Sequence, residues 1–231
     1  MVKINRVYTG GGDGGESSLV DGSRRRKSDP RFDVVGLCDE LNSWVGAVLM
    51  ELARLPAHED GGDRTTVQRV QTVASEALSR VQNELFDLGA ELACPPDNLP
   101  DYMVLLSEEQ TDVLVQEMDA WLEHLEALTS FILPTGSPPV AFTHLARTVT
   151  RRLERAVVFL AQREGEDAVR HVVKVYLNRL SDWFFVLGRW MSATLNEEET
   201  LWVPLGQRPA EQGVAHRVAQ MRSNDDDLSS I

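Results

Sequence analysis

The sequence is poor in cysteine and has no long apolar run. Its 231 residues include two cysteines, Cys38 and Cys94, in no CxxC spacing. This excludes a disulfide framework and a four-cysteine zinc site, and we interpret both residues as buried thiols in a reducing compartment. No apolar segment of the signal-peptide kind follows the start, and no uninterrupted apolar stretch is long enough to span a bilayer. We therefore expect a cytoplasmic protein without a membrane partner.

Cationic side chains are also scarce. Lys and Arg total 23 against 36 Asp and Glu, which gives a formal net charge of −13 at pH 7. A chain of this charge repels a phosphate backbone, so we expect no nucleic-acid partner. Any anionic ligand must instead be held by a local cluster of cations.

Several catalytic motifs are missing. The sequence contains neither GxSxG nor HExxH, and no His follows a Glu by three residues, which removes the di-iron bundle motif. Neither a nucleophile–base pair nor a metal site built from protein ligands alone is visible. If the protein is an enzyme, a substrate or cofactor must therefore bring its own reactivity.

Helical periodicity dominates what is present. Residues 1–27 form a glycine-rich N-terminal segment, 28–205 carry the periodic pattern, and 206–231 are polar and predicted to be a disordered tail. Caps, prolines and apolar spacings of three and four predict five helices. These cover about 28–55, 66–94, 107–133 and 138–163, and a last stretch from just after Gly165 to about Leu195. The predicted fold is an all-α, five-helix up-and-down bundle.

The N-terminal segment offers a weak phosphate-binding signal. Gly10, Gly12 and Gly15 satisfy GxGxxG, and Gly10 to Ser17 has Walker A spacing with Glu16 in place of the lysine. A flexible linker explains this segment as well. Because glycine has no Cβ, the backbone N–H groups of this segment could nevertheless approach a triphosphate closely and bind it.

The predicted fourth helix carries the cation cluster that the acidic composition requires. Arg147, Arg151, Glu154 and Arg155 stand at i, i+4, i+7 and i+8, so they share one face. A solvated basic face is the alternative, but guanidinium groups are natural ligands of phosphate oxygens. The opposite face is predicted to be apolar, with Leu145, Val149, Leu153, Ala156 and Leu160.

Two further polar patches stand beside apolar stripes. Asn178, Ser181 and Asp182 lie in the predicted fifth helix, where a core polar network explains them as well as a ligand does. Asp39 and Glu40 lie in the predicted first helix, where exposed carboxylates are the default. Neither patch decides between these alternatives alone.

Four segments, taken together, resemble the PduO-type ATP:corrinoid adenosyltransferases. They are YTGGGDGGESS, KSDPRFDVVGLCDELNSWVGA, FILPTGSPPVAFTHLARTVTRRLERAVV and YLNRLSDWFFVLGRW, in the family's order. The resemblance implies a ferritin-like homotrimer whose N-terminal loop folds over MgATP between subunits. It also implies transfer of the 5′-deoxyadenosyl group of ATP to Co(I) of cob(I)alamin, with adenosylcobalamin and triphosphate as products.

The resemblance assigns roles to individual residues. It places the corrinoid on Phe131 and Ser181, with Phe131 displacing the lower axial base of cobalt. It pairs Arg147 with Asp39 across the subunit interface, and it makes Glu154 a candidate contact for Mg²⁺. The implied ATP-binding residues are Thr9, Gly10, Gly11, Gly12, Ser17, Ser18, Lys27, Arg151, Arg152, Leu153, Glu154, Arg155 and Asn178.

One departure and two alternatives accompany this resemblance. Many relatives have Lys where this chain has Gly14, so one cation of the loop is missing. A corrinoid carrier that delivers adenosylcobalamin to a mutase would keep Phe131 but need neither the arginine stripe nor the glycine loop. A purely structural bundle would leave the stripe and the loop unexplained. Transfer itself needs no protein base because Co(I) is the nucleophile, and a reductase must supply its electron.

Overall fold

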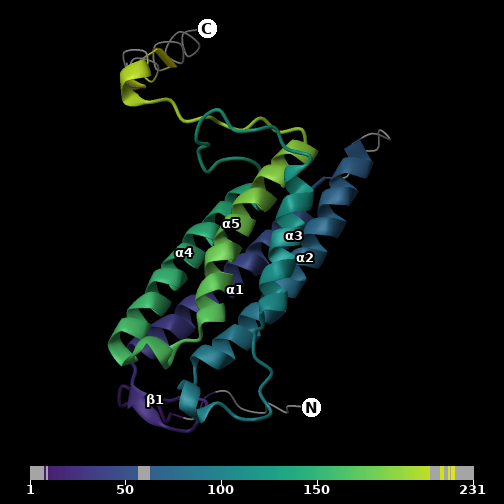
Figure 1. Cartoon of the computed structure of the whole chain (residues 1–231). Coiled ribbons are helices and arrows are strands. Elements are labelled where there is room, and N and C mark those ends of the chain that lie inside the picture. The colour runs from purple at the N-terminus through teal and green to yellow at the C-terminus, as the bar shows by residue number, and fades with distance from the viewer. Residues whose placement is uncertain are drawn as a thin grey trace.

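The computed structural model describes Tyr8, residues 10–56 and 63–208, and residues 214, 215, 218, 220 and 221, with only the backbone at 63–65. Five long helices run alternately up and down (Figure 1). They are α1 Pro30–Ala53, α2 Asp63–Leu92, α3 Glu108–Leu122, α4 Pro138–Glu164 and α5 His171–Thr194. The predicted all-α bundle is confirmed. None of the described helices combines the length and apolar character that a membrane span requires.

One predicted helix end is wrong. The third helix ends at Leu122, and residues 123–137 form a loop rather than its continuation. This loop pairs instead with a distant segment, through an isolated bridge between Ile132 and Leu201, and so gives up the helical hydrogen-bond pattern. The predicted tail lies mostly outside the described residues.

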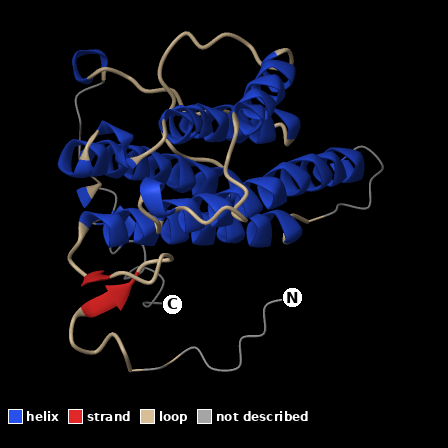
Figure 2. Cartoon of the chain, turned by 60° about the horizontal axis from the view of Figure 1, so that its bottom comes forward, coloured by secondary structure: helices blue, strands red, loops and turns tan. Residues whose placement is uncertain are grey.

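A short hairpin also interrupts the predicted N-terminal loop. Its strands, β1 (Glu16–Ser18) and β2 (Arg24–Arg26), pair antiparallel below the helices (Figure 2). The connection contains Gly22 at φ +80°, a left-handed conformation that glycine adopts readily.

The helices begin at the predicted caps. The Asp29 side chain accepts a hydrogen bond from the backbone N–H of Arg31, with Pro30 in the first turn of α1. Ser107 and Gln110 form the predicted capping box of α3. These local contacts satisfy backbone groups that have no partner within the helix.

The core lies where the helices face one another, with α1 between α2 and α4 and with α5 against α4 and α3. The predicted apolar face of α4 is largely confirmed, since Val149, Leu153 and Leu160 are buried. Leu145 is 41% exposed, whereas Thr143 and Thr150 are buried. Both threonine hydroxyls donate to carbonyls one turn back, at 2.8 Å, so these polar residues can be buried at little cost.

Both cysteines are buried and free, as interpreted from the sequence. Burial raises the pKa of the Cys38 thiol to about 12. Its thiolate is therefore absent at neutral pH, and Cys38 is an inert core residue.

A buried arginine ties the hairpin to the base of the bundle. Arg31 is 1% exposed, and its guanidinium donates to the carbonyls of Leu92 and Cys94 at 3.0 and 3.1 Å. It also pairs with Glu164 at the end of α4, which accepts from Arg25 of β2 at 2.5 Å. One carboxylate thus joins α1, α4 and the hairpin.

We expect Glu164→Gln to lower the free energy of unfolding by about 3 kcal/mol, because it leaves the buried Arg31 without an anion. Burial alone would raise the pKa of Glu164, but hydrogen bonds and charge from Arg31 and Arg25 outweigh it and lower the pKa. The stabilisation is therefore complete above the ordinary Glu pKa of about 4.3 and is lost as pH falls through the lower native value. Denaturant titrations at pH 7 and near pH 3 measure this difference.

Glu166→Gln is the matched control. Glu166 is exposed and pairs with Lys174 at 3.2 Å, so its loss should cost under about 1 kcal/mol. Equal losses of unfolding free energy in the two variants would contradict the stabilising role of Glu164. A loss in Glu164→Gln that does not change with pH would contradict it as well.

Candidate functional site

The arginines on the outer surface of α4 make different contacts. Arg152 pairs with Glu40 of α1, and Arg155 donates to the carbonyl of Arg151 at 2.9 Å. The Arg151 guanidinium is exposed and makes no hydrogen bond or ion pair with any described side chain. Glu154 accepts a 3.0 Å hydrogen bond from the Asn178 amide of α5. The stripe therefore keeps one guanidinium free and one carboxylate oriented by a neighbour.

Arg147, one turn above, is partly buried without an anion. Its guanidinium carbon lies 6.0 Å from the centre of the Phe185 ring, and its Nε is buried with no partner in the described structure. Desolvation, followed by the positive charge of Arg151, lowers the pKa of Arg147. Such a cation is costly to leave uncompensated, so an anion from outside the chain is expected here.

Asp39 is not that anion within one chain. It lies exposed on α1, where its carbonyl accepts from the Ser43 hydroxyl, and it has no contact with Arg147. Gly36, one turn earlier, has open space where a Cβ would stand. Small and acidic side chains thus leave this outer face of α1 accessible.

The glycine loop has the conformation of a tight double turn. Gly10 and Gly15 have φ of +71° and +83°, and backbone bonds of 3.2 Å join Asp13 to Gly10 and Gly15 to Gly12. Thr9 lies outside the described residues.

Cations cover this loop from the hairpin side. Arg24 donates to the Gly11 carbonyl at 2.8 Å, and a Cβ on Gly12 would lie 3.0 Å from Lys27 Nζ. Glycine at position 12 therefore lets the Lys27 ammonium approach the loop backbone. Ser17 and Ser18 follow in β1.

The loop and the free arginine are far apart in one chain. The hairpin attaches at Glu164, and Arg151 lies about 20 Å further up α4 at 1.5 Å per residue. The structure brings Glu154 and Asn178 together, but it does not bring Gly10–Gly12 to Arg151.

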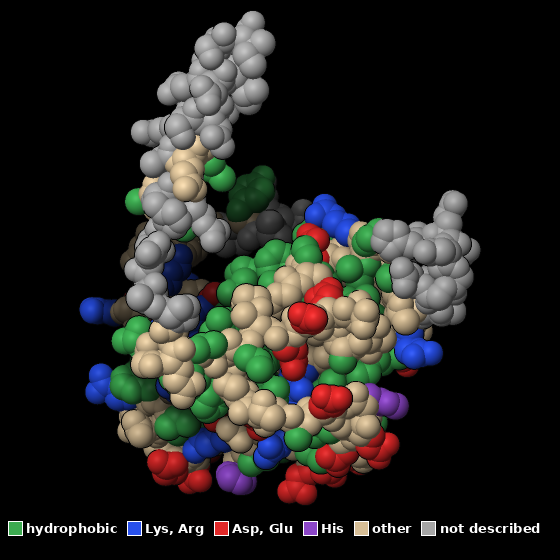
Figure 3. Space-filling view, turned by 90° about the horizontal axis from the view of Figure 1, so that it is seen from above, with side chains coloured by type: hydrophobic (Ala, Val, Ile, Leu, Met, Phe, Trp, Pro, Cys, Tyr) green, Lys and Arg blue, Asp and Glu red, His purple; other side chains and the backbone are tan. Residues whose placement is uncertain are grey.

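An apolar shelf lies at the opposite end of the bundle. Phe131 is 77% exposed, so ordinary core packing does not explain it. Its ring centre lies 6.1 Å from that of Trp202, and its carbonyl accepts from the Trp202 N–H at 2.7 Å. A hollow of about 740 Å³ opens here, lined by Leu128, Thr129, Ser130, Phe131, Leu201, Trp202, Val203, Pro204 and Gln207. Hydrophobic side chains reach the surface at this end (Figure 3).

Comparisons with known proteins agree on one family. Residues 7–191 match the family model described as cobalamin adenosyltransferase. The chain belongs to the cobalamin adenosyltransferase family. It is 38% identical over 204 residues to a cobalamin adenosyltransferase of Cupriavidus metallidurans, covering 87% of this chain and 95% of that protein. It is 37% identical over 210 residues to a corrinoid adenosyltransferase of Mycobacterium tuberculosis, covering 90% and 98%.

Solved structures give the same result. A variant of the PduO-type ATP:corrinoid adenosyltransferase of Lactobacillus reuteri, in complex with cobalamin and ATP, superposes with a TM-score of 0.73. That structure is 31% identical, and the match covers 86% of this chain and all of the other. A second variant of that enzyme, in complex with ATP, gives a TM-score of 0.71 at 32% identity.

Sequence reasoning about this member of the cobalamin adenosyltransferase family missed half of the shelf. Leu201, Trp202 and Val203 line the hollow together with Phe131, yet they were not singled out. The available signal was an apolar triplet that follows the acidic run Glu197-Glu198-Glu199 after one intervening residue, Thr200.

Ser181 is placed away from the shelf. It is 1% exposed, and its hydroxyl donates to the carbonyl of Asn178 at 3.0 Å. Asp182 is exposed and pairs with Arg179 at 2.9 Å. Of the three polar residues in this part of α5, Asn178 is the one whose side chain reaches the arginine stripe.

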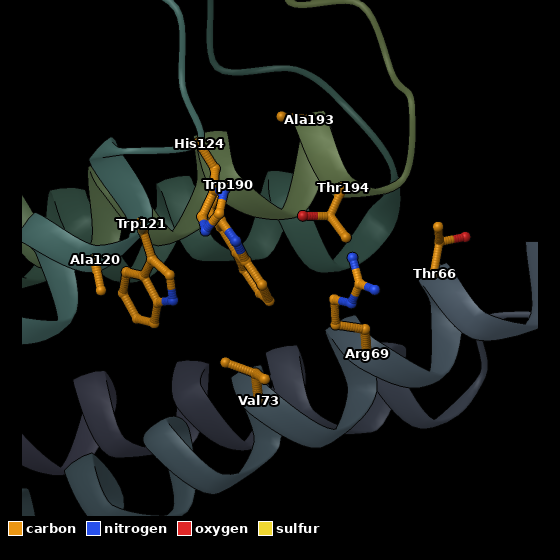
Figure 4. Close-up of a pocket in the computed structure, with 9 residues that line it drawn as sticks. All are labelled: Thr66, Arg69, Val73, Ala120, Trp121, His124, Trp190, Ala193 and Thr194. Carbon is orange, nitrogen blue, oxygen red and sulfur yellow. The ribbon is translucent and has the colours of Figure 1, made fainter.

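A second hollow, of about 640 Å³, lies between the upper parts of α2, α3 and α5. Trp121 and Trp190 project into it from α3 and α5, opposite Val73 and Arg69 of α2 (Figure 4). None of the residues predicted to bind ATP or corrinoid lines it. It is therefore separate from the arginine stripe and from the shelf.

Proposed function

We propose that this chain transfers the 5′-deoxyadenosyl group of ATP to Co(I) of cob(I)alamin, forming adenosylcobalamin and releasing triphosphate. The observation that carries the proposal is the exposed guanidinium of Arg151, which has no partner among the described side chains, in a chain of net charge −13. Its relatives are corrinoid adenosyltransferases, and the related Lactobacillus enzyme was solved with ATP and cobalamin. A carrier of finished adenosylcobalamin would not need such a free cation.

The residues fit the two substrates by their chemistry. Arg151 and Arg155 present guanidinium groups that bind phosphate oxygens and stabilise the charge that develops on departing triphosphate. The loop at Gly10–Gly12, with Thr9 before it and Lys27 over it, supplies backbone N–H groups for the same anion. The apolar surface of Phe131 and Trp202 suits the face of a corrin ring and keeps water from the cobalt.

The metal is expected to arrive with the nucleotide. Glu154, between Arg151 and Arg155, is the carboxylate that could reach a Mg²⁺ bound to the triphosphate. No three His, Cys, Asp or Glu side chains gather as a metal site within the described residues. Phosphate oxygens and water would therefore supply most Mg²⁺ ligands, as is usual for this ion.

The active form is proposed to be a homotrimer with its sites between subunits. In one chain Arg151 lies about 20 Å along α4 from Glu164, the residue that holds the hairpin, and Arg147 has no anionic partner among the described residues. The open face of α1 at Gly36 and Asp39 would let a neighbouring subunit approach closely. Such an approach could bring the glycine loop of one subunit to Arg151 of another and supply an anion to Arg147. The two free cysteines fit a cytoplasmic location.

We expect Arg151→Ala to slow ATP-dependent alkylation of cob(I)alamin by about tenfold to a hundredfold, because one charge-assisted contact to triphosphate is lost. Chemically reduced cobalamin, ATP and Mg²⁺ are mixed with the protein, and the visible spectrum reports alkylation. Stability should not change, since Arg151 is exposed.

Arg163→Ala is the matched control, an arginine of the same helix that lies over Phe159 at 5.4 Å, outside the stripe. It should retain the wild-type rate. An unchanged rate in Arg151→Ala would remove that residue from the site, and a wild-type protein unable to alkylate cobalamin would refute the proposed function.

Gly14→Lys should lower the ATP concentration that gives half-maximal rate, because it adds a cation beside the phosphates. Nothing lies within 4 Å of a Cβ at Gly14, and its φ is not positive, so the side chain fits without strain. Gly15→Lys adds the same charge at φ +83° and should weaken ATP use instead. Equal effects of the two variants on the ATP dependence would contradict a direct phosphate contact.

Asp39 and Arg147 should behave as a coupled pair across the subunit interface. Asp39→Arg would place two cations together and weaken both assembly and transfer, by about 3–5 kcal/mol if the pair is buried. The exchange with Arg147→Asp should restore assembly, measured by sedimentation, better than activity. Additive losses in the double-mutant cycle would show that the two residues do not touch.

A further inference from the structure

The apolar shelf is built from two segments far apart in sequence, 130–137 and 197–203. Ser130 donates to the carbonyl of Trp202 at 2.9 Å, Leu133 N–H donates to the Thr200 carbonyl at 2.8 Å, and the Trp202 N–H donates to Phe131. The hydroxyls of Thr135 and Thr200 lie 3.1 Å apart. The two segments are thus joined mainly by polar contacts near solvent.

Apolar packing contributes little to this junction. Phe131, Leu201, Trp202 and Val203 are all at least 40% exposed. Hydrogen bonds exposed to water contribute only modestly to stability. A loop pairing of this kind opens easily unless something beneath it holds both segments.

Arg189 of α5 is placed beneath both segments. It is 7% exposed, and its Nε and Nη2 contact the two carboxylate oxygens of Glu199 at 2.8 and 3.2 Å. The same Nη2 donates to the Glu126 carbonyl at 3.0 Å, in the loop that leads to Phe131. One rigid guanidinium therefore binds both the segment after α5, through Glu199, and the loop after α3, through Glu126.

We propose that Arg189 and Glu199 are positioning residues for the corrinoid: their ion pair holds Phe131 and Trp202 together as one shelf. This inference rests on the proposed function, since it concerns the binding of the corrinoid substrate. Neither residue lies in the arginine stripe or the glycine loop, so the pair should affect the corrinoid and not ATP.

The test is Glu199→Gln, which keeps the shape but turns an amide NH₂ toward the guanidinium. We expect the KM for cob(I)alamin to rise about tenfold, with the KM for ATP unchanged and kcat altered less than the corrinoid KM. Arg189→Lys retains the charge but loses the bidentate contact, so its corrinoid KM should be intermediate. Corrinoid affinity measured directly, by quenching of tryptophan fluorescence with cobalamin, should fall in the same order.

A second ion pair, made by the cap residue that precedes α5, provides a matched control. At the other end of the helix, Arg170 makes a bidentate contact with Glu91 at 2.8 and 2.7 Å and donates to the Leu106 carbonyl at 2.8 Å. Glu91→Gln therefore breaks the same set of contacts with a comparable loss of stability, but away from the shelf. Its corrinoid KM should remain that of the wild type.

The outcomes separate this inference from the proposed function. A wild-type protein that does not alkylate cob(I)alamin refutes the function itself. An active wild type with an unchanged corrinoid KM in Glu199→Gln, or a raised corrinoid KM in Glu91→Gln as well, overturns the positioning role.

If Glu199→Gln does not fold, Thr200→Val tests the same junction without touching the ion pair. It removes the hydroxyl contact with Thr135 and should raise the corrinoid KM about two- to threefold, the effect of one neutral hydrogen bond. An unchanged value in that variant would equally refute the role of the junction.

Discussion

Helix α4 is packed on two sides, against α1 and α5, and this packing determines what its remaining surface can do. The buried sides take Leu153, Val157 and Leu160 into the core, and threonines whose hydroxyls bond to the helix itself complete the buried surface. The arginines are thereby held on the outer side. The first turn of α4 follows the shelf, and its last residue, Glu164, holds the hairpin. A single rigid helix thus spaces the features proposed to bind the corrinoid, the triphosphate and the loop.

Ion pairing distinguishes structural arginines from binding ones. Arg31, Arg170 and Arg189 each meet a carboxylate and at least one backbone carbonyl, and such contacts compensate a buried guanidinium. Carboxylates are plentiful in this acidic chain, yet Arg151 and Arg147 have no carboxylate partner among the described residues. The fold leaves these two cations for a ligand or a neighbouring subunit.

The shelf differs from the bundle in how it is held together. Helices of the bundle bury continuous apolar stripes, whereas the segments carrying Phe131 and Trp202 leave their large side chains exposed and depend on hydrogen bonds and on Arg189. An apolar surface that must accept a large ring cannot also be covered by its own chain. An ion pair and hydrogen bonds on the inner side of the two segments can hold them together while their apolar side chains stay exposed.

The sequence by itself determined the features that depend on local spacing. The capping box at Ser107, the start of α1 at Asp29 and the shared face of Arg147, Arg151 and Arg155 follow from helical geometry, which repeats every 3.6 residues. The family resemblance, also read from the sequence, was confirmed by comparison.

Tertiary structure alone decided which side of each helix is buried and which distant segments meet. Leu145 was expected on the apolar face of α4 but is 41% exposed, whereas Thr143 and Thr150 are buried. The third helix ends early because part of the loop after it, residues 130–137, pairs with the chain after α5, and the Arg189–Glu199 pair depends on that meeting. Spacing along one helix is set by covalent geometry, but contacts between elements depend on how whole surfaces pack, and no local pattern encodes that packing.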